Sequence, residues 1–201
     1  MNPVSVDQVT KEFGDFTAVD RADLQVATGE IVGLVGANGA GKTTLMRMIL
    51  GLLAPSAGSI RLFGERQTRE QRKRVGYVPQ NLGLYTDLTV AENLQFRADT
   101  FGATAATSDA VPGLVRDIPL GAQRQAAFIA ATQHHPELLI LDEPTSGVSP
   151  LARTFLWEMI RERAEDGVAV LVSTHYMDEA EQADRVVLMS QGRVVANGSI
   201  S

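Results

Sequence analysis

Four glycines and a lysine occur within ten residues of this sequence, between an apolar run and an amphipathic one. The segment, residues 33–42, reads GLVGANGAGK. Glycines let successive backbone N–H groups converge on one point, and they allow the main chain to approach an anion closely. The preceding residues 30–35 have the composition of a short buried strand, and residues 44–50 that of the start of an amphipathic helix. The glycines therefore fill a strand-to-helix turn.

This turn has the residue types that hold the phosphates of a nucleoside triphosphate. It matches the pattern G-x-x-x-x-G-K-[ST] at Gly36, Gly41, Lys42 and Thr43. The following helix directs its partly positive N-terminus at the same place. Lys42 can reach the β- and γ-phosphates, and the Thr43 hydroxyl can bind Mg²⁺. A glycine-rich turn beside a surface lysine is the structural alternative, but the chain has only three lysines. We expect the nucleotide to be bound by Gly36, Ala37, Asn38, Gly39, Ala40, Gly41, Lys42, Thr43 and Thr44.

A second segment, LLILDEP at residues 138–144, ends an apolar strand in two carboxylates. Asp142 would hold the Mg²⁺ that Thr43 binds, usually through water. Glu143 would orient and deprotonate the water that attacks the γ-phosphate. An apolar strand that ends in an acidic turn is common by itself. Together with the phosphate loop, the segment predicts that the chain hydrolyses a nucleoside triphosphate.

The composition limits the class of protein. The chain has 201 residues, of which 44% are hydrophobic, enough for a substantial core. A net charge of −6 argues against a nucleic-acid partner bound through bulk positive charge. The absence of cysteine from the sequence excludes disulfides and is compatible with a reducing cytoplasm. We find no basic, apolar leader and no run of about 20 apolar residues. The sequence therefore predicts a soluble chain that reaches a membrane only through a partner.

Strand and helix patterns alternate along the chain, which predicts a mostly parallel sheet with helices on both faces. The expected strands are residues 4–9, 23–26, 30–35, 59–63, 75–78, 138–141 and 168–173, with a hairpin of 186–189 and 193–196. The expected helices are residues 44–50, 68–74, 89–101, 121–134, 150–165 and 177–184. The third of these begins with Thr89 and Glu92 in the arrangement of a capping box. Residues 103–111 are small and polar and are expected to form a loop.

The chain resembles the ATP-binding cassette (ABC) ATPases along almost its whole length. Its motifs occur in that family's order: the phosphate loop, YVPQ at 77–80, a signature-like segment, LILDEPTSG, and STH at 173–175. The resemblance implies that Gln80 contacts Mg²⁺ and senses the transport partner, and that His175 contacts the γ-phosphate. It also implies that Phe13 stacks on the adenine. A core position for Phe13 and a hydrogen-bonded strand end for His175 remain the alternatives.

Three segments narrow the resemblance to the ATPases of ABC-2-type exporters, including multidrug exporters. They read GLYTDLTVAENL, DEPTSGVSPLAR and STHYMDEAEQADRVVLMSQGRVVANGS. The resemblance implies a transport-coupled ATPase with ATP and Mg²⁺. Its implied partners are a transmembrane permease subunit and a second cassette, which places the chain on the inner, cytoplasmic face of the plasma membrane.

The signature segment departs from the family pattern. It reads Ile118-Pro119-Leu120-Gly121, so that Pro119 stands where the family usually has serine and Leu120 where it usually has glycine. Some exporters of this type also have L-P-L-G. By resemblance, Pro119, Leu120 and Gly121 would face the nucleotide of the opposite cassette, without the serine hydroxyl. The aspartate usual in the loop after the acidic pair is Ser149. In a homodimer, both ATP sites would lack the serine hydroxyl. We therefore prefer a partner cassette with an intact signature, with a homodimer as the alternative.

The resemblance predicts one cassette over residues 1–201. Its fold would be α/β: a RecA-like P-loop NTPase core of about 1–80 and 126–201, with an antiparallel β-layer at the N-terminus. A helical insert at about 81–125 is shortened, because only 17 residues (102–118) separate the helix that begins at Thr89 from Pro119. Two other functions stay open: a soluble, non-transport ABC ATPase, for example one on the ribosome, and a weakly active nucleotide-binding structural subunit.

Overall fold

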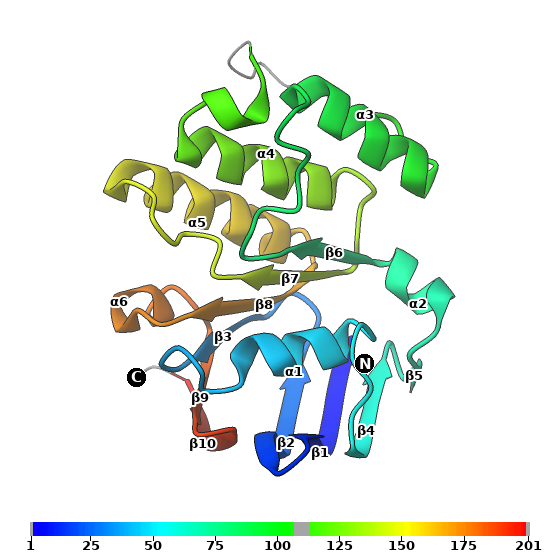
Figure 1. Cartoon of the computed structure of the whole chain (residues 1–201), viewed down its shortest axis with the longest axis vertical. Coiled ribbons are helices and arrows are strands. Elements are labelled where there is room, and N and C mark those ends of the chain that lie inside the picture. The colour runs from blue at the N-terminus through cyan, green and yellow to red at the C-terminus, as the bar shows by residue number, and fades with distance from the viewer. Residues whose placement is uncertain (1, 107–112, 200–201) are drawn as a thin grey trace.

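The computed structural model describes residues 2–106 and 113–199, which form two β-sheets and the helices around them (Figure 1). The four-stranded sheet is antiparallel, in the order β2-β1-β4-β5. Its strands are β1 (Val4–Phe13), β2 (Phe16–Val26), β4 (Ala57–Leu62) and β5 (Glu65–Arg66). The six-stranded sheet has the order β10-β9-β3-β8-β7-β6. Its strands are β3 (Ile31–Val35), β6 (Val75–Val78), β7 (Leu138–Asp142), β8 (Ala169–Thr174), β9 (Arg185–Ser190) and β10 (Arg193–Gly198).

The six-stranded sheet is parallel except for its last strand pair. β3, β6, β7, β8 and β9 run in one direction, and β10 returns antiparallel to β9 as the predicted hairpin. Every residue of β3, β7 and β8 is buried, as expected for parallel strands covered on both faces. The α/β core with an antiparallel N-terminal layer is therefore confirmed.

Alternate residues of the parallel strands enter two different cores, because successive strand side chains point to opposite faces. On one face, α1 (Lys42–Ile49) lies between the two sheets, and Leu34 and Leu171 belong to its core. On the other face, Leu141 and Val172 pack against α4 (Leu120–Thr132) and α5 (Pro150–Glu165). Phe128 and Trp157 are the large side chains of this second core. The sheet is thereby fixed from both sides.

The helical insert is short but has an apolar cluster of its own. It consists of α3 (Val90–Phe101), a 3₁₀ turn (Val115–Asp117) and the beginning of α4. The predicted capping box is present, with Thr89 and Glu92 bonded reciprocally. Gln133 accepts a hydrogen bond from the Ala106 N–H and donates one to the Leu94 carbonyl, which ties the insert to the end of α4. The cluster consists of Val90, Leu94, Val115, Ile118, Ala126 and Ala130.

Several element bounds differ from the prediction. The acidic helix expected over 177–184 ends early as α6 (Met177–Ala180), because the chain must turn into β9. Asp184 takes part in that turn, and its carboxylate accepts a hydrogen bond from the Ile31 N–H. The helix expected from residue 121 begins at Leu120, and the first two strands extend to a hairpin at residues 14–15. The remaining helix, α2, is Arg69–Lys73. Of the expected loop 103–111, residues 107–111 lie outside the described part of the chain.

We predict that His134 makes the stability of the fold depend on pH. Its ring stacks on the ring of Phe101, with 4.0 Å between the two centroids. Its Nε2 lies 3.3 Å from the Val75 carbonyl oxygen. Burial lowers the pKa of His134 below 6.5; the carbonyl of Val75 opposes this shift and the charge of Arg97 adds to it. At pH values between the lowered pKa of His134 in the folded chain and its ordinary pKa in the unfolded chain, the unfolded chain binds more protons. The free energy of unfolding therefore falls as the pH drops below about 6.5.

Denaturant unfolding between pH 5 and 7.5 tests this expectation. The His134→Gln variant should show a smaller loss of unfolding free energy than the original chain over this interval. The carboxylates contribute equally to both proteins and cancel in the difference. Identical pH profiles for the two proteins would contradict the role of His134.

Candidate active site

Two glycines of the phosphate loop, Gly36 and Gly41, stand where a side chain would collide with the backbone of another strand. Gly41 precedes α1 with φ at +102°, a left-handed conformation that glycine adopts without strain. A Cβ on Gly41 would lie 2.5 Å from the Ala18 carbonyl oxygen, and one on Gly36 would collide with the Met189 carbonyl. At Gly36 and Gly41 the loop therefore fits against β2 and β9 only without a side chain, which allows the close approach of the backbone that an anion site needs.

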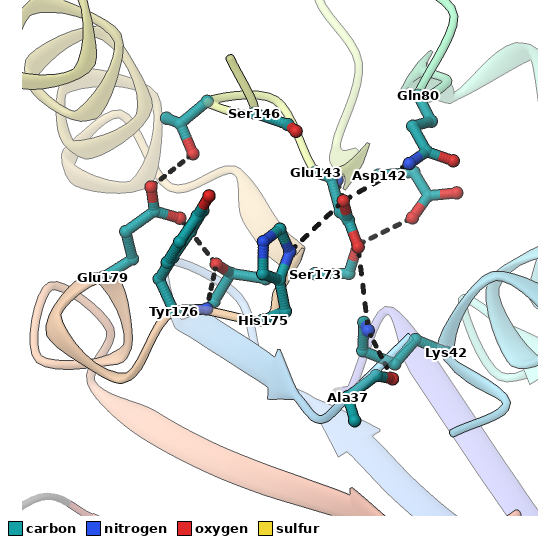
Figure 2. A network of polar contacts seen from close by, with 12 residues as sticks. Ala37, Lys42, Gln80, Asp142, Glu143, Ser146, Ser173, His175, Tyr176 and Glu179 are labelled. Atoms are coloured by element: carbon teal, nitrogen blue, oxygen red, sulfur yellow. Dashed lines mark hydrogen bonds and ion pairs between the residues drawn. The ribbon is translucent and has the colours of Figure 1, made fainter. Parts of the chain in front are cut away.

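Lys42 is buried beneath this loop, with 4% of its surface exposed. Its ammonium donates hydrogen bonds to the carbonyl oxygens of Gly36 at 2.7 Å and Ala37 at 3.1 Å. The same nitrogen lies 3.7 Å from Oε1 of Glu143. Two carbonyl oxygens of the phosphate loop therefore hold the ammonium of Lys42 in place, close to the carboxylate of Glu143 (Figure 2).

Glu143 is the point at which the predicted catalytic side chains meet (Figure 2). Its Oε2 accepts a hydrogen bond from Nε2 of Gln80 at 3.3 Å and lies 3.4 Å from Nδ1 of His175. The residue is 7% exposed and has φ at +50°, a strained conformation for a residue with a side chain. Residues from β6, β7 and β8 come together here because parallel strands bring their carboxyl ends to one edge of the sheet.

Asp142 has the surroundings of a ligand for a hard cation. It is 1% exposed, and its Oδ1 accepts hydrogen bonds from Ser173 Oγ at 2.7 Å and Thr43 Oγ1 at 3.3 Å. A carboxylate has about four lone-pair sites, so two hydroxyl donors leave capacity for a cation. Oxygen ligands and few protein donors suit Mg²⁺, which keeps several waters. The hydroxyl and carboxylate oxygens present therefore fit the Mg²⁺ that the sequence resemblance implies.

A cavity of about 320 Å³ opens over the phosphate loop and Glu143. Phe16, which is 63% exposed, lines it. Phe13 is 51% exposed and lies beside Lys11, whose ammonium is 5.1 Å from the centroid of its ring. Phe13 and Phe16 face each other across the β1–β2 turn. The stacking of Phe13 on adenine stays a prediction, and the structure adds Phe16 as a second aromatic candidate. The lining residues are Phe16, Ala18, Asn38, Gly39, Gly41, Lys42, Thr43, Thr44, Gln80 and Glu143.

The signature residues do not line this cavity. Pro119 is the N-cap of α4 and makes no side-chain capping bond, and Leu120 begins the helix half-exposed. A Cβ on Gly121 would lie 2.9 Å from the Cβ of Ala152, so this glycine allows α4 to pack closely on α5. Ser149 caps α5 by accepting a hydrogen bond from the Ala152 N–H. Within one chain, these residues form a helix end, so any contact with nucleotide requires a second chain.

Sequence reasoning missed two residues that hold the site together. Ser173 accepts a hydrogen bond from the Glu143 N–H at 3.0 Å while its hydroxyl donates to Asp142. Arg124 is buried and donates to the carbonyl oxygens of Gln80 and Ser146. Both lie inside segments that the sequence had singled out, STH and the signature helix, but their contacts depend on the tertiary fold.

One further group beside the site keeps a fixed protonation state. Burial raises the pKa of the Tyr77 phenol, and the negative charge of Asp142 adds to the effect. The phenol therefore stays neutral at physiological pH, so its hydroxyl can still donate a hydrogen bond next to the acidic pair.

Comparison with known proteins identifies the family. The family profile described as ABC transporter matches residues 19–146. The chain is 42% identical to the Nod factor export ATP-binding protein I of Paraburkholderia xenovorans, over 98% of this chain and 71% of that protein. It is also 38% identical to the probable multidrug ABC transporter ATP-binding protein YbhF of Escherichia coli, covering 98% of this chain. The chain belongs to the ATP-binding cassette family.

Solved structures agree with this assignment. The structure of an ATP-binding subunit of an ABC transporter superposes with a TM-score of 0.85 at 29% identity, covering 98% of this chain and 90% of that one. A dimeric cassette bound to ADP and Pi shares the fold, with a TM-score of 0.84 at 23% identity and coverage of 98% and 99%. The chain spans only 37% of the length of YbhF. Among the described residues, no helix has both the length and the apolarity needed to cross a bilayer.

The phosphate loop generates a prediction about affinity. Lys42→Ala should weaken ATP binding by about 2–4 kcal/mol, because a desolvated charge–phosphate contact is lost. Isothermal titration calorimetry measures the difference. Lys73→Ala is the matched control, since Lys73 is an exposed lysine paired with Glu70. Equal ATP affinities for the original chain and Lys42→Ala would show that this loop does not bind the phosphates.

Proposed function

We propose that this chain binds ATP with Mg²⁺, hydrolyses it, and thereby drives export through a separate transmembrane permease subunit. The observation that carries the proposal is the convergence of Lys42, Gln80 and His175 on the buried carboxylate of Glu143. Family membership supports ATP hydrolysis. The names of the relatives, one a multidrug transporter protein and the other a Nod factor export protein, support the exporter role.

In this proposal each residue of the site has a task in hydrolysis. The N–H groups of the phosphate loop and the ammonium of Lys42 bind the β- and γ-phosphates. The carboxylate of Glu143 accepts a proton from the attacking water, and His175 contacts the γ-phosphate from the adjacent strand end. Thr43, Asp142 and Gln80 would hold Mg²⁺, which neutralises charge on the phosphates. Gln80 follows the end of β6 and donates a hydrogen bond to Glu143. A change at Glu143 during hydrolysis would therefore move Gln80, through which the permease could sense it.

A second cassette completes the site in this proposal. Two cassettes would close head to tail around two MgATP, each presenting its signature helix to the nucleotide of the other. Pro119 and Leu120 present no hydroxyl there, so a partner cassette with an intact signature is preferred over a homodimer. The complex would lie on the cytoplasmic face of the plasma membrane, and the permease would select the exported substrate. No nucleic-acid partner is proposed.

Glu143→Gln tests the assignment of the general base. The variant should bind ATP as tightly as the original chain and turn over at least about 10²-fold more slowly, because the amide accepts no proton. Steady-state phosphate release and calorimetry measure the two quantities. Light scattering should show a longer-lived dimer in the presence of ATP. If the variant still hydrolyses ATP at the original rate, the base is another residue, with His175 the next candidate.

Pro119→Ser with Leu120→Gly tests the role of the variant signature. A hydrogen bond to a charged group contributes about 1.5–3 kcal/mol, so regaining it in the transition state should speed turnover by roughly 10- to 100-fold. The unmodified chain should be slow alone. ATPase rates over a series of protein concentrations measure both effects.

The matched control for this pair is Pro119→Ala with Leu120→Gly, which makes the same backbone change without the hydroxyl. It should stay close to the original rate. Brisk turnover by the unmodified chain, unaffected by the double substitution, would contradict the preference for an asymmetric partner.

A further inference from the structure

A buried glutamate joins the two loops that carry Glu143 and His175. Glu179 lies in α6 and is 2% exposed. Its Oε1 accepts a hydrogen bond from the hydroxyl of Thr145 at 2.6 Å, and its Oε2 accepts one from the hydroxyl of Thr174 at 2.6 Å. Thr145 follows Glu143 by two positions, and Thr174 directly precedes His175. Figure 2 shows Glu179 beside both loops, on the far side of His175 from Lys42.

A cation and two aromatic contacts extend this arrangement to the His175 ring. Nε of Arg153, in α5, lies 3.2 Å from Oε1 of Glu179. The guanidinium also lies 5.2 Å from the centroid of the Tyr176 ring, which in turn packs on the His175 ring at 4.0 Å. The Tyr176 N–H donates to the Thr174 hydroxyl at 3.0 Å. The His175 ring therefore packs on Tyr176, and Tyr176 contacts Arg153, which is paired with Glu179.

Both oxygens of the Glu179 side chain are used as hydrogen-bond acceptors. Each oxygen accepts from a hydroxyl, and an ionised carboxylate is acceptor-only. Burying such a charge is costly unless it is paired and hydrogen-bonded, and an apolar residue would fill the same space at lower cost. Unlike an apolar residue, a carboxylate can hold two hydroxyls in fixed positions relative to each other, because each of its oxygens accepts one hydrogen bond.

We propose that Glu179 is a positioning residue for ATP hydrolysis. It sets the 3.4 Å separation between Nδ1 of His175 and Oε2 of Glu143 by fixing the loop that follows each strand. It touches neither the phosphate loop residues nor the cavity above them. The inference rests on the proposed function, since it concerns the same site. It assigns to α6 a part in catalysis rather than only in the packing of the sheet.

Glu179→Gln, compared with Asp178→Asn, separates positioning from general stability. Asp178 is the adjacent residue of α6 and approaches the same Arg153, at 3.4 Å, but its side chain is 70% exposed. In Glu179→Gln we expect kcat to fall by at least about 10-fold, because a small misplacement of catalytic groups is costly in rate. The Kd for ATP should change by less than about threefold, since the phosphate loop is untouched. Asp178→Asn should leave both quantities within about twofold of the original.

A merely structural role would give a different result. Loss of kcat that is matched by loss of ATP affinity, or an unchanged kcat, would overturn the proposal. If Glu179→Gln does not fold, Thr145→Val removes one of the two bonds with little change of volume and should give the same split between kcat and Kd. Combining Thr145→Val with Glu179→Gln should add little further loss, because both variants break the same link.

A spectroscopic measurement tests the positioning without hydrolysis. The sequence contains three histidines, so the ring signals of His175 can be assigned by NMR. Glu143→Gln should shift these signals in the original chain, and the shift should be at least halved in the Glu179→Gln background. An equal shift in both backgrounds would overturn the positioning role. If the shift is halved but the original chain hydrolyses no ATP, the positioning is supported and the proposed function is contradicted.

Discussion

A lysine and two carboxylates are buried together at one edge of the parallel sheet, and the site depends on keeping their charges compensated. Removing an ion from water costs several kcal/mol even after relaxation. Lys42 is compensated by two loop carbonyls and by Glu143, and Asp142 by two hydroxyls. The carboxylate of Glu143 is stabilised by the amide of Gln80 and the ammonium of Lys42. The backbone of Glu143 adopts a strained left-handed conformation in this position. A phosphate would therefore enter an arrangement in which each of these charges already has a partner.

The register of the parallel strands determines which groups can take part. β7 and β8 pair so that Asp142 lies opposite Ser173, and β3 and β8 pair so that Val35 lies opposite Thr174. A shift of one residue would turn each of these side chains to the other face of the sheet. Ser173 can therefore bond to the carboxylate of Asp142 and to the N–H of Glu143 only in this register. The apolar packing on both faces, which fixes the register, thus also aligns the polar groups of the proposed site.

The parts of the site that the sequence predicts well are those encoded in consecutive residues. The strand, glycine loop and helix around Lys42, and the apolar strand that ends in Asp142 and Glu143, are local patterns, and the structure has them where they were expected. The capping box at Thr89 is equally local. Contacts such as those of Arg124 and Glu179 join segments that are distant in the chain, and no spacing rule indicates them. Phe16 enters the cavity because of the twist and turn of β1 and β2, which the composition does not determine.

The variant signature is explained in part by packing inside the chain. The side chain of Leu120 lies against Gly147, where even a Cβ would be 3.2 Å from it, and Gly147 has φ at +77°. A residue with a side chain at 147 would be both strained and in contact with the leucine. Leu120 and Gly147 therefore form a matched pair that closes the space between the start of α4 and the loop after Glu143. Leu120, which stands where the family usually has glycine, is thus packed against the loop after Glu143 in its own chain. In the head-to-tail pair proposed above, the signature segment would therefore be shaped first by packing in its own chain, and its contact with the nucleotide of a second cassette would have to fit around Leu120.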